Sequence, residues 1–126
     1  MKNKFFYKIT FLLLMGIMNM AFFANAQQLA KGEKQTILER IEVSGSSSSM
    51  VMGLTDIPAN ETKDFHIHNF PEVAYVLEGE ITIFIQNGKS FSVKKGESFQ
   101  IKPDIKHKTK AGPKGAQVLF TILSKK

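Results

Sequence analysis

Short runs of alternating apolar and polar residues recur along the chain, with turn-forming residues between them. They occupy residues 36–43, 50–57, 64–68, 72–77, 80–86, 89–93, 98–101, 105–110 and 116–123. Successive side chains of a strand point to opposite faces, so this alternation indicates half-buried β-strands. No run after residue 26 keeps the helical period of about 3.6 residues. About eight short strands at regular spacing predict an all-β sandwich or barrel.

Gly, Asn and Ser residues mark the connections between these runs. Asn87-Gly88 is the strongest hairpin signal, because both central positions of a type I′ turn need positive φ. Further turns are expected at Glu78-Gly79, at residues 94–97 and at residues 112–115. The Ser- and Gly-rich segment 44–49 has too little side chain to bury and predicts a mobile loop, with a lid over a pocket as the alternative.

Met50 and Met52 share one face of a predicted strand. Two methionines on one face can act as thioether ligands of copper. At strand spacing, however, methionines are more often core filler, so we expect both side chains in the core.

The first 26 residues have the pattern of a secretory signal peptide. A basic start at residues 1–8 is followed by an apolar run at residues 9–23 and by Ala24-Asn25-Ala26. The small-x-small ending predicts cleavage after Ala26, which leaves Gln27 as the mature N-terminus. An uncleaved anchor is the alternative, since the apolar run approaches the length that spans a bilayer. We expect export to a bacterial periplasm and no stable membrane anchor after cleavage.

The predicted mature chain is small, weakly basic and free of cysteine. Its 100 residues, 27–126, suffice for one domain with a core at about 36–123. The net charge of +6 falls to +3 without the three lysines of the leader, which weakens any case for nucleic acid binding. Without cysteine, neither a lipid-modified N-terminus nor a disulfide is expected.

Candidate chemistry begins at His66 and His68. In an extended strand their imidazoles point to the same face, with Ile67 turned away, and can chelate one metal ion. The turn-like segment 69–71 then brings Glu72 beside them. Two imidazoles and one carboxylate suit Fe, Mn, Ni, Cu or Zn. Packed or surface histidines are the alternative, since two or three of them in one domain are ordinary.

The remaining histidine of the chain, His107, lies on a stretch with clear alternation. One parity holds Ile101, Pro103, Ile105, His107 and Thr109, and the other holds Lys102, Asp104, Lys106, Lys108 and Lys110. Placing the charged residues outward places His107 inward, on an apolar face. The lysine row is interpreted as a solvated or edge-protecting face, with attraction of an anionic ligand as the alternative.

The same parity argument orients the segment after Glu72. If Glu72 faces inward, Ala74 and Val76 face inward with it. Tyr75 and Leu77 then face outward, toward another layer or another subunit. A 100-residue barrel with such outward residues is expected to form a homodimer, because burying them adds stability that a small core lacks.

These residues resemble the cupin superfamily, whose first motif is G-x5-H-x-H-x3,4-E-x6-G and whose second is G-x5-P-x-G-x2-H-x3-N. His66, His68, Glu72 and Gly79 stand at the spacing of the first motif, and Asn60 takes its leading Gly position. Asn tolerates the left-handed conformation that Gly usually supplies. The first motif therefore matches without a gap.

The second motif matches less closely. Gly96 is in place and His107 keeps the expected distance from it, but Lys102 stands at the Pro position and Asp104 at the Gly position. Ala111 stands at the closing Asn position. Asp also tolerates turn geometry, so a turn is still expected there.

The resemblance covers residues 60–123 and implies a double-stranded β-helix, the cupin jelly-roll barrel. It implies that His66, His68, Glu72 and His107 converge on one divalent metal inside the barrel, which is Fe, Mn, Ni, Zn or Cu. It also implies similarity to small cupins described as quercetin-dioxygenase-like. Such a protein is a metal-dependent dioxygenase or isomerase of a small oxygen-chelating substrate, with Glu72 as ligand or catalytic base.

Two other functions remain open from the sequence. The same barrel can hold a sugar or a small acid without turnover, because function does not follow from fold. Alternatively, the His and Glu matches are leftovers in a barrel that binds no metal.

Overall fold

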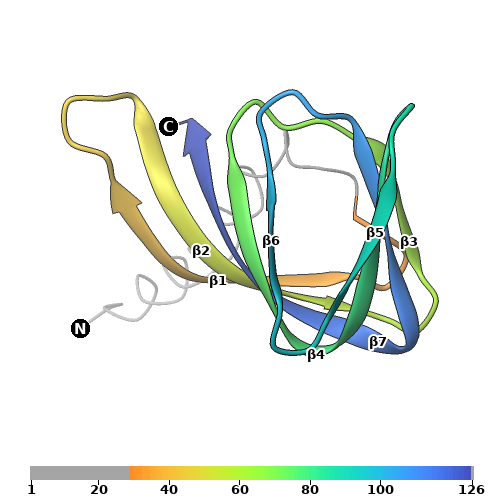
Figure 1. Cartoon of the computed structure of the whole chain (residues 1–126). Coiled ribbons are helices and arrows are strands. Elements are labelled where there is room, and N and C mark those ends of the chain that lie inside the picture. The colour runs from red at the N-terminus through yellow and green to blue at the C-terminus, as the bar shows by residue number, and fades with distance from the viewer. Residues whose placement is uncertain (1–28, 126) are drawn as a thin grey trace, which may run out of the picture.

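The computed structural model describes residues 29–125, which fold as β-strands joined by turns (Figure 1). The strands are β1 (Lys34–Glu42), β2 (Ser48–Ile57), β3 (Thr62–His66), β4 (Glu72–Ile85), β5 (Ser90–Lys94), β6 (Ser98–Ile101) and β7 (His107–Lys125). These strands pair antiparallel and no helix occurs within residues 29–125, which confirms the all-β prediction. None of these residues forms a helix that could cross a membrane. The predicted signal peptide, residues 1–26, lies outside them.

Two long strands organise the barrel. β4 and β7 pair with each other from Glu72 opposite Ile122 to Ile85 opposite His107. The first part of β4 also pairs with β6 and the second part with β5, while β7 pairs with β3 near its start and with β2 near its end. The sheet curls into a barrel, and the β1–β2 hairpin projects from one side of it (Figure 1). This is the jelly-roll architecture that the sequence resemblance implies.

The predicted turns at Glu78-Gly79 and at residues 112–115 are wrong, because β4 and β7 continue through them. The β4–β7 pairing instead shifts register on both sides of Glu78-Gly79. Gly79 and Gly115 have φ of 72° and 77°, and a Cβ on Gly79 would clash with the carbonyl oxygen of Gly115. Bulges of this kind bend a strand without ending it, so one strand serves two sides of the barrel.

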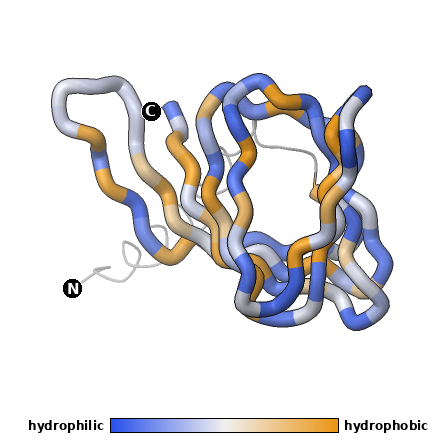
Figure 2. Tube along the Cα trace, viewed as in Figure 1, coloured by the Kyte–Doolittle hydropathy of each residue, from blue (hydrophilic) through white to orange (hydrophobic). Residues whose placement is uncertain are grey.

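The core fills the barrel with inward side chains of β4, β5, β6 and β7. They include Ala74, Val76, Ile81, Ile83, Val93, Ile101, Ala111, Ala116, Val118 and Phe120. The inward orientation predicted for Ala74 and Val76 is confirmed, and Tyr75 between them is 43% exposed. Apolar and polar residues accordingly alternate along the strands in Figure 2.

Met50 and Met52 lie on the outer face, so the prediction that they fill the core is wrong. They are 45% and 39% exposed, whereas Val51 between them is 3% exposed. The inward position after Met52 is Gly53, where a Cβ would meet the Phe120 ring at 2.6 Å. The Phe120 ring occupies the core volume at this point, so the small residues of β2 face inward and its methionines face outward.

Two connections also differ from their predicted form. Asn87-Gly88 does join β4 to β5, but of the two only Asn87 has positive φ, at 57°, so the turn is not type I′. The β1–β2 connection comprises residues 43–47, because β2 already begins at Ser48. In Figure 1 the tip of this hairpin lies away from the barrel.

Candidate metal centre

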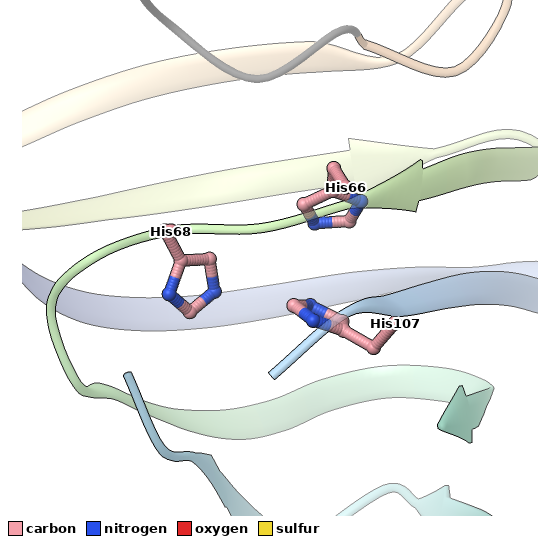
Figure 3. Close-up of side chains that lie close together, drawn as sticks. All are labelled: His66, His68 and His107. Carbon is pink, nitrogen blue, oxygen red and sulfur yellow. The ribbon is translucent and has the colours of Figure 1, made fainter. Parts of the chain in front are cut away.

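Histidines from two distant segments of the chain meet inside the barrel, with His66 and His68 on one segment and His107 on the other (Figure 3). His66 is the last residue of β3, which ends earlier than predicted. The alternation nevertheless continues, since Ile67 is 50% exposed and His68 is buried. The N–H of Asp104 donates to the His68 carbonyl oxygen at 3.0 Å and holds this segment against the loop before β7.

His107 is the first residue of β7 and pairs with His66 across the β3–β7 ladder. It is 2% exposed, which confirms the inward orientation predicted from parity, and Lys106 beside it is exposed. Pro103, which the same parity places inward, is exposed, because the chain turns at Pro103 and Asp104 instead of continuing as a strand.

The three imidazoles are close enough to share an ion. Ring centroids are 4.3 Å apart for His66 and His107, 5.1 Å for His68 and His107, and 6.2 Å for His66 and His68. One ring nitrogen of each residue lies within 4.8 Å of those of the other two. Nitrogens bound to one ion are about 3 to 4 Å apart, given metal–nitrogen bonds of about 2.1 Å. A small movement of the rings therefore brings all three into one coordination sphere.

Each imidazole is oriented by a hydrogen bond between Nδ1 and a main-chain carbonyl oxygen. The acceptors are Asp64 for His66, Phe70 for His68 and Ile105 for His107, each at 2.8 Å. A carbonyl oxygen can only accept, so Nδ1 carries the proton and Nε2 of the neutral ring carries the free lone pair. Metal-binding histidines are typically oriented in this way.

Glu72 is the first residue of β4, and its carboxylate lies beside His68. The distance from Glu72 Oε2 to His68 Nε2 is 3.0 Å, yet the buried Nε2 makes no hydrogen bond of suitable geometry with the described part of the chain. Two ligand atoms at right angles on one ion, with bonds of about 2.1 Å, are also about 3 Å apart. The geometry fits an ion bound by this oxygen and this nitrogen. Glu72 is not among the three residues whose ligand atoms all lie within 4.8 Å of one another.

The pKa values of the three imidazoles are shifted in different directions. Desolvation by burial lowers the pKa of His66 to about 4, and it also lowers the pKa of His107. Burial acts in the same direction on His68, but the Glu72 carboxylate and the Phe70 carbonyl outweigh it, so the pKa of His68 is raised. His66 and His107 are therefore harder to protonate than a free imidazole, whereas His68 is easier to protonate because the Glu72 carboxylate faces it.

The motif positions that favour glycine all have positive φ. The angles are 61° at Asn60, 72° at Gly79, 86° at Gly96 and 62° at Asp104. Asn60 thus adopts the left-handed conformation that its motif position favours, and the turn expected at Asp104 is present. The turn that contains Asp104 is also the one that bonds to the His68 carbonyl oxygen, so it helps to position a candidate ligand.

A buried ion pair beside the centre escaped the sequence analysis. Lys63 of β3 is 6% exposed, and its Nζ lies 3.5 Å from Oε1 of Glu33, which is 8% exposed. Simple alternation places Lys63 on the face opposite to His66. The β3–β7 pairing shifts register between these two residues, and this irregularity turns both side chains inward. The hydropathy pattern carries no signal for it.

Comparisons with known proteins agree with the fold. The cupin domain model matches residues 53–122, which include the three histidines and Glu72. No curated protein sequence matches the chain. Solved structures that resemble it include the Schizosaccharomyces pombe Cnp3 cupin domain, with TM-score 0.60 and 18% identity over 75% of this chain and 63% of that chain.

Two further structures illustrate the range of similar proteins. The polyketide cyclase RemF from Streptomyces resistomycificus has TM-score 0.59 and 24% identity, over 79% of this chain and 69% of that chain. An RmlC-like cupin from Shewanella frigidimarina has TM-score 0.53 and 19% identity, over 77% of this chain and 88% of that chain. The chain thus spans less than two thirds of the Cnp3 domain, and identities this low show the fold alone. The family match spans more than half of the 126 residues, and the chain therefore belongs to the cupin domain family.

Proposed function

We propose that this protein binds one divalent transition metal through Nε2 of His66, His68 and His107 and a carboxylate oxygen of Glu72. The observation that carries the proposal is the set of three Nδ1 hydrogen bonds to main-chain carbonyl oxygens, which leaves three Nε2 lone pairs available on rings that lie close together. Three imidazoles and one carboxylate suit Fe, Mn, Ni, Zn or Cu.

We further propose that the centre acts on a small substrate that chelates through oxygen, as a dioxygenase-like enzyme or an isomerase. A bound divalent ion with open positions would supply Lewis acidity to a substrate oxygen. Glu72, next to His68, would leave the ion to accept the proton that a substrate hydroxyl loses. Val76 and Ile83, both fully buried, keep water from the inner part of the barrel. A structurally similar protein is a polyketide cyclase, so this fold can carry an enzyme.

Metal analysis of protein purified from its native compartment tests the centre. We expect about one equivalent per chain, and less than about a tenth of an equivalent with no uptake on reconstitution would identify a metal-free barrel. Anaerobic binding of diketones and flavonols, followed by exposure to oxygen, tests turnover. Substrate loss supports the enzyme, whereas binding without substrate loss identifies a non-catalytic binder of a sugar or small acid.

We propose that the protein works in the periplasm, on the evidence of the basic, apolar and Ala-x-Ala segments of residues 1–26. Mass spectrometry of the mature protein from a native periplasmic fraction tests this assignment. We expect a chain that begins at Gln27. An intact N-terminus in the membrane fraction would identify an anchored protein instead.

We also propose a homodimer, because the outer face of β1, β2, β7 and β4 carries neighbouring apolar side chains. Cross-strand pairs on this face join Ile41 with Met50, Met50 with Leu123, Leu54 with Leu119 and Leu119 with Tyr75, and Met52 and Val73 both lie opposite Thr121. Five apolar side chains of this face are between 39% and 61% exposed: Ile41, Met50, Met52, Val73 and Tyr75. Leu77, which was predicted to face outward, is half-buried. A continuous apolar face of this kind suits a second copy of the chain.

A further inference from the structure

The four candidate ligands are not all held in place by the sheet. His66 and His107 are partners in the β3–β7 ladder, so the pairing of these strands fixes their relative position. Glu72 begins β4, where it pairs with both β6 and β7. His68 lies between β3 and β4 and has no ladder partner within residues 29–125. A contact outside the ladders therefore has to fix the position of His68.

The turn before β7, residues 102–105, contacts both segments that form the centre. The Asp104 N–H donates to the His68 carbonyl oxygen at 3.0 Å. The carbonyl oxygen of the next residue, Ile105, accepts from His107 Nδ1 at 2.8 Å. Adjacent residues of one turn thus hold His68 by its main chain and His107 by its side chain. The shape of this turn therefore sets the separation of these two rings, whose centroids are 5.1 Å apart.

The shape of the turn depends on the left-handed conformation of Asp104. Its φ is 62°, and Pro103 precedes it, which is the sequence pattern of a type II turn. Glycine and residues with short polar side chains tolerate this conformation, whereas β-branched residues do not. Asp104 is exposed, and its contact with the centre is made by its main-chain N–H. A residue that leaves the left-handed conformation would turn this N–H away from the His68 carbonyl oxygen.

We propose that Asp104 is a positioning residue, whose left-handed main chain fixes the separation of His68 from His107 and so sets the affinity of the centre for its metal. This inference rests on the proposed metal centre and adds a residue that does not itself bind the ion. The turn holds the two rings before an ion arrives. The metal-free protein therefore already has its imidazoles close to the arrangement that the ion requires.

Substitutions of Asp104 separate the effect of its conformation from that of its charge. Asp104→Asn and Asp104→Gly remove the carboxylate but keep a residue that tolerates positive φ, so both should bind Co²⁺ within about twofold of wild type. Asp104→Val removes the same charge and disfavours positive φ. Its Co²⁺ affinity should fall by about 10- to 100-fold, the usual effect of losing an outer-shell partner. Competition with a chromophoric chelator measures the affinities.

Asn60→Val is the matched control. Asn60 has φ of 61°, and its N–H donates to the Gly112 carbonyl oxygen at 3.0 Å, so the substitution disturbs a turn contact of the same kind. Asn60 precedes β3, whereas His66 is the last residue of that strand. Asn60→Val should lower the free energy of unfolding, as Asp104→Val does. It should leave Co²⁺ affinity within about twofold of wild type, because its turn contacts no candidate ligand.

NMR of the metal-free proteins measures the positioning without any ion. A nuclear Overhauser effect between the His68 and His107 rings should be present in wild type, Asp104→Asn and Asp104→Gly, because the ring centroids are 5.1 Å apart. It should be lost in Asp104→Val. If Asp104→Val does not fold, Asp104→Ala, which is not β-branched, should show the same two losses to a smaller extent.

Two results would overturn the inference. One is equal Co²⁺ affinity in Asp104→Val and Asp104→Asn with the ring contact intact in both. The other is an equal loss of affinity in Asn60→Val, which would show that strain anywhere in the barrel weakens the centre. A wild type that binds no Co²⁺ would instead defeat the proposed metal centre, while the ring contact in the metal-free variants would still decide whether Asp104 positions His68.

Discussion

His66 and His107 face each other across one position of the β3–β7 ladder, with ring centroids 4.3 Å apart. Replacing either with Ala removes one Nε2 donor and should lower metal affinity by at least about 100-fold, more than the loss of an outer-shell partner costs. Ile67→Ala is the control, because Ile67 lies between His66 and His68 but is half exposed. Competition with a chromophoric chelator measures the affinity, and equal values for all variants would contradict the site.

Glu72→Gln should have two separate effects. Metal affinity should fall by about 10- to 100-fold, because a charged oxygen next to His68 becomes neutral. In the metal-free protein the pKa of His68 should fall, because burial is then opposed by the Phe70 carbonyl without the carboxylate. NMR titration reads the pKa directly. Glu78→Gln, at an exposed ion pair with Lys95, should show neither change.

The metal-free protein should lose stability as the pH falls from about 6.5 to about 4. The pKa of His66 is lowered to about 4 from an ordinary value of 6.5, so over this interval the unfolded chain binds a proton that the folded chain does not. His107 acts in the same direction. His68, with its raised pKa, acts oppositely: its contribution is full below its unfolded pKa and is lost above its folded one.

The substitution His66→Gln separates the contribution of His66 to the pH dependence of stability from that of the carboxylates. Because His66 is partly exposed, solvent screening reduces its share to about 1 to 2 kcal/mol. Urea unfolding in EDTA at several pH values should show that wild type loses more stability than His66→Gln on acidification. Parallel curves for the two proteins would contradict the lowered pKa.

Gly79→Ala should destabilise the barrel far more than Gly45→Ala. Both glycines have positive φ, which costs a residue with a side chain about 1 to 2 kcal/mol. At Gly45 an added Cβ meets no described atom within 4 Å, whereas at Gly79 it meets the carbonyl oxygen of Gly115. We expect a total loss of about 3 kcal/mol or more for Gly79→Ala. Equal free energies of unfolding for the two variants would show that the β4 bulge adapts.

Val73→Lys should convert the proposed dimer into a monomer. Val73 is 57% exposed on the outer apolar face, and a lysine there would place two like charges in the interface. Phe91→Lys is the control, because Phe91 is exposed on β5, outside the face formed by β1, β2, β7 and β4. Sedimentation velocity at micromolar concentration separates the outcomes. A monomeric wild type would reject the dimer.

Parity predicts side-chain orientation well wherever a strand runs without irregularity. Ala74, Val76 and His107 all face inward as predicted. Ala74 and Val76 share the parity of Glu72, and the neighbours of His107 on the opposite parity are lysines, which require the solvent side. Turn positions can also be predicted from residue type. Asn60 and Asp104 adopt the left-handed conformation, which their short polar side chains tolerate.

Bulges and contacts between distant parts of the chain cannot be predicted from local sequence patterns. Lys63 turns inward because of an irregularity between it and His66, and such a shift has no hydropathy signature. Met52 faces outward because Phe120, far away in the chain, packs against Gly53. β4 bends at Gly79 but does not end there, because Gly79 packs closely against Gly115 of β7.

The closing strand has a consequence for the order of events in the cell. β7 supplies His107 and also pairs with β2, β3 and β4. During synthesis, an emerging chain has His66, His68 and Glu72 long before it has the strand that supplies His107. If the proposed centre holds an ion, its coordination by all four side chains is then the last step of folding, and a nascent chain stalled before β7 has an incomplete site.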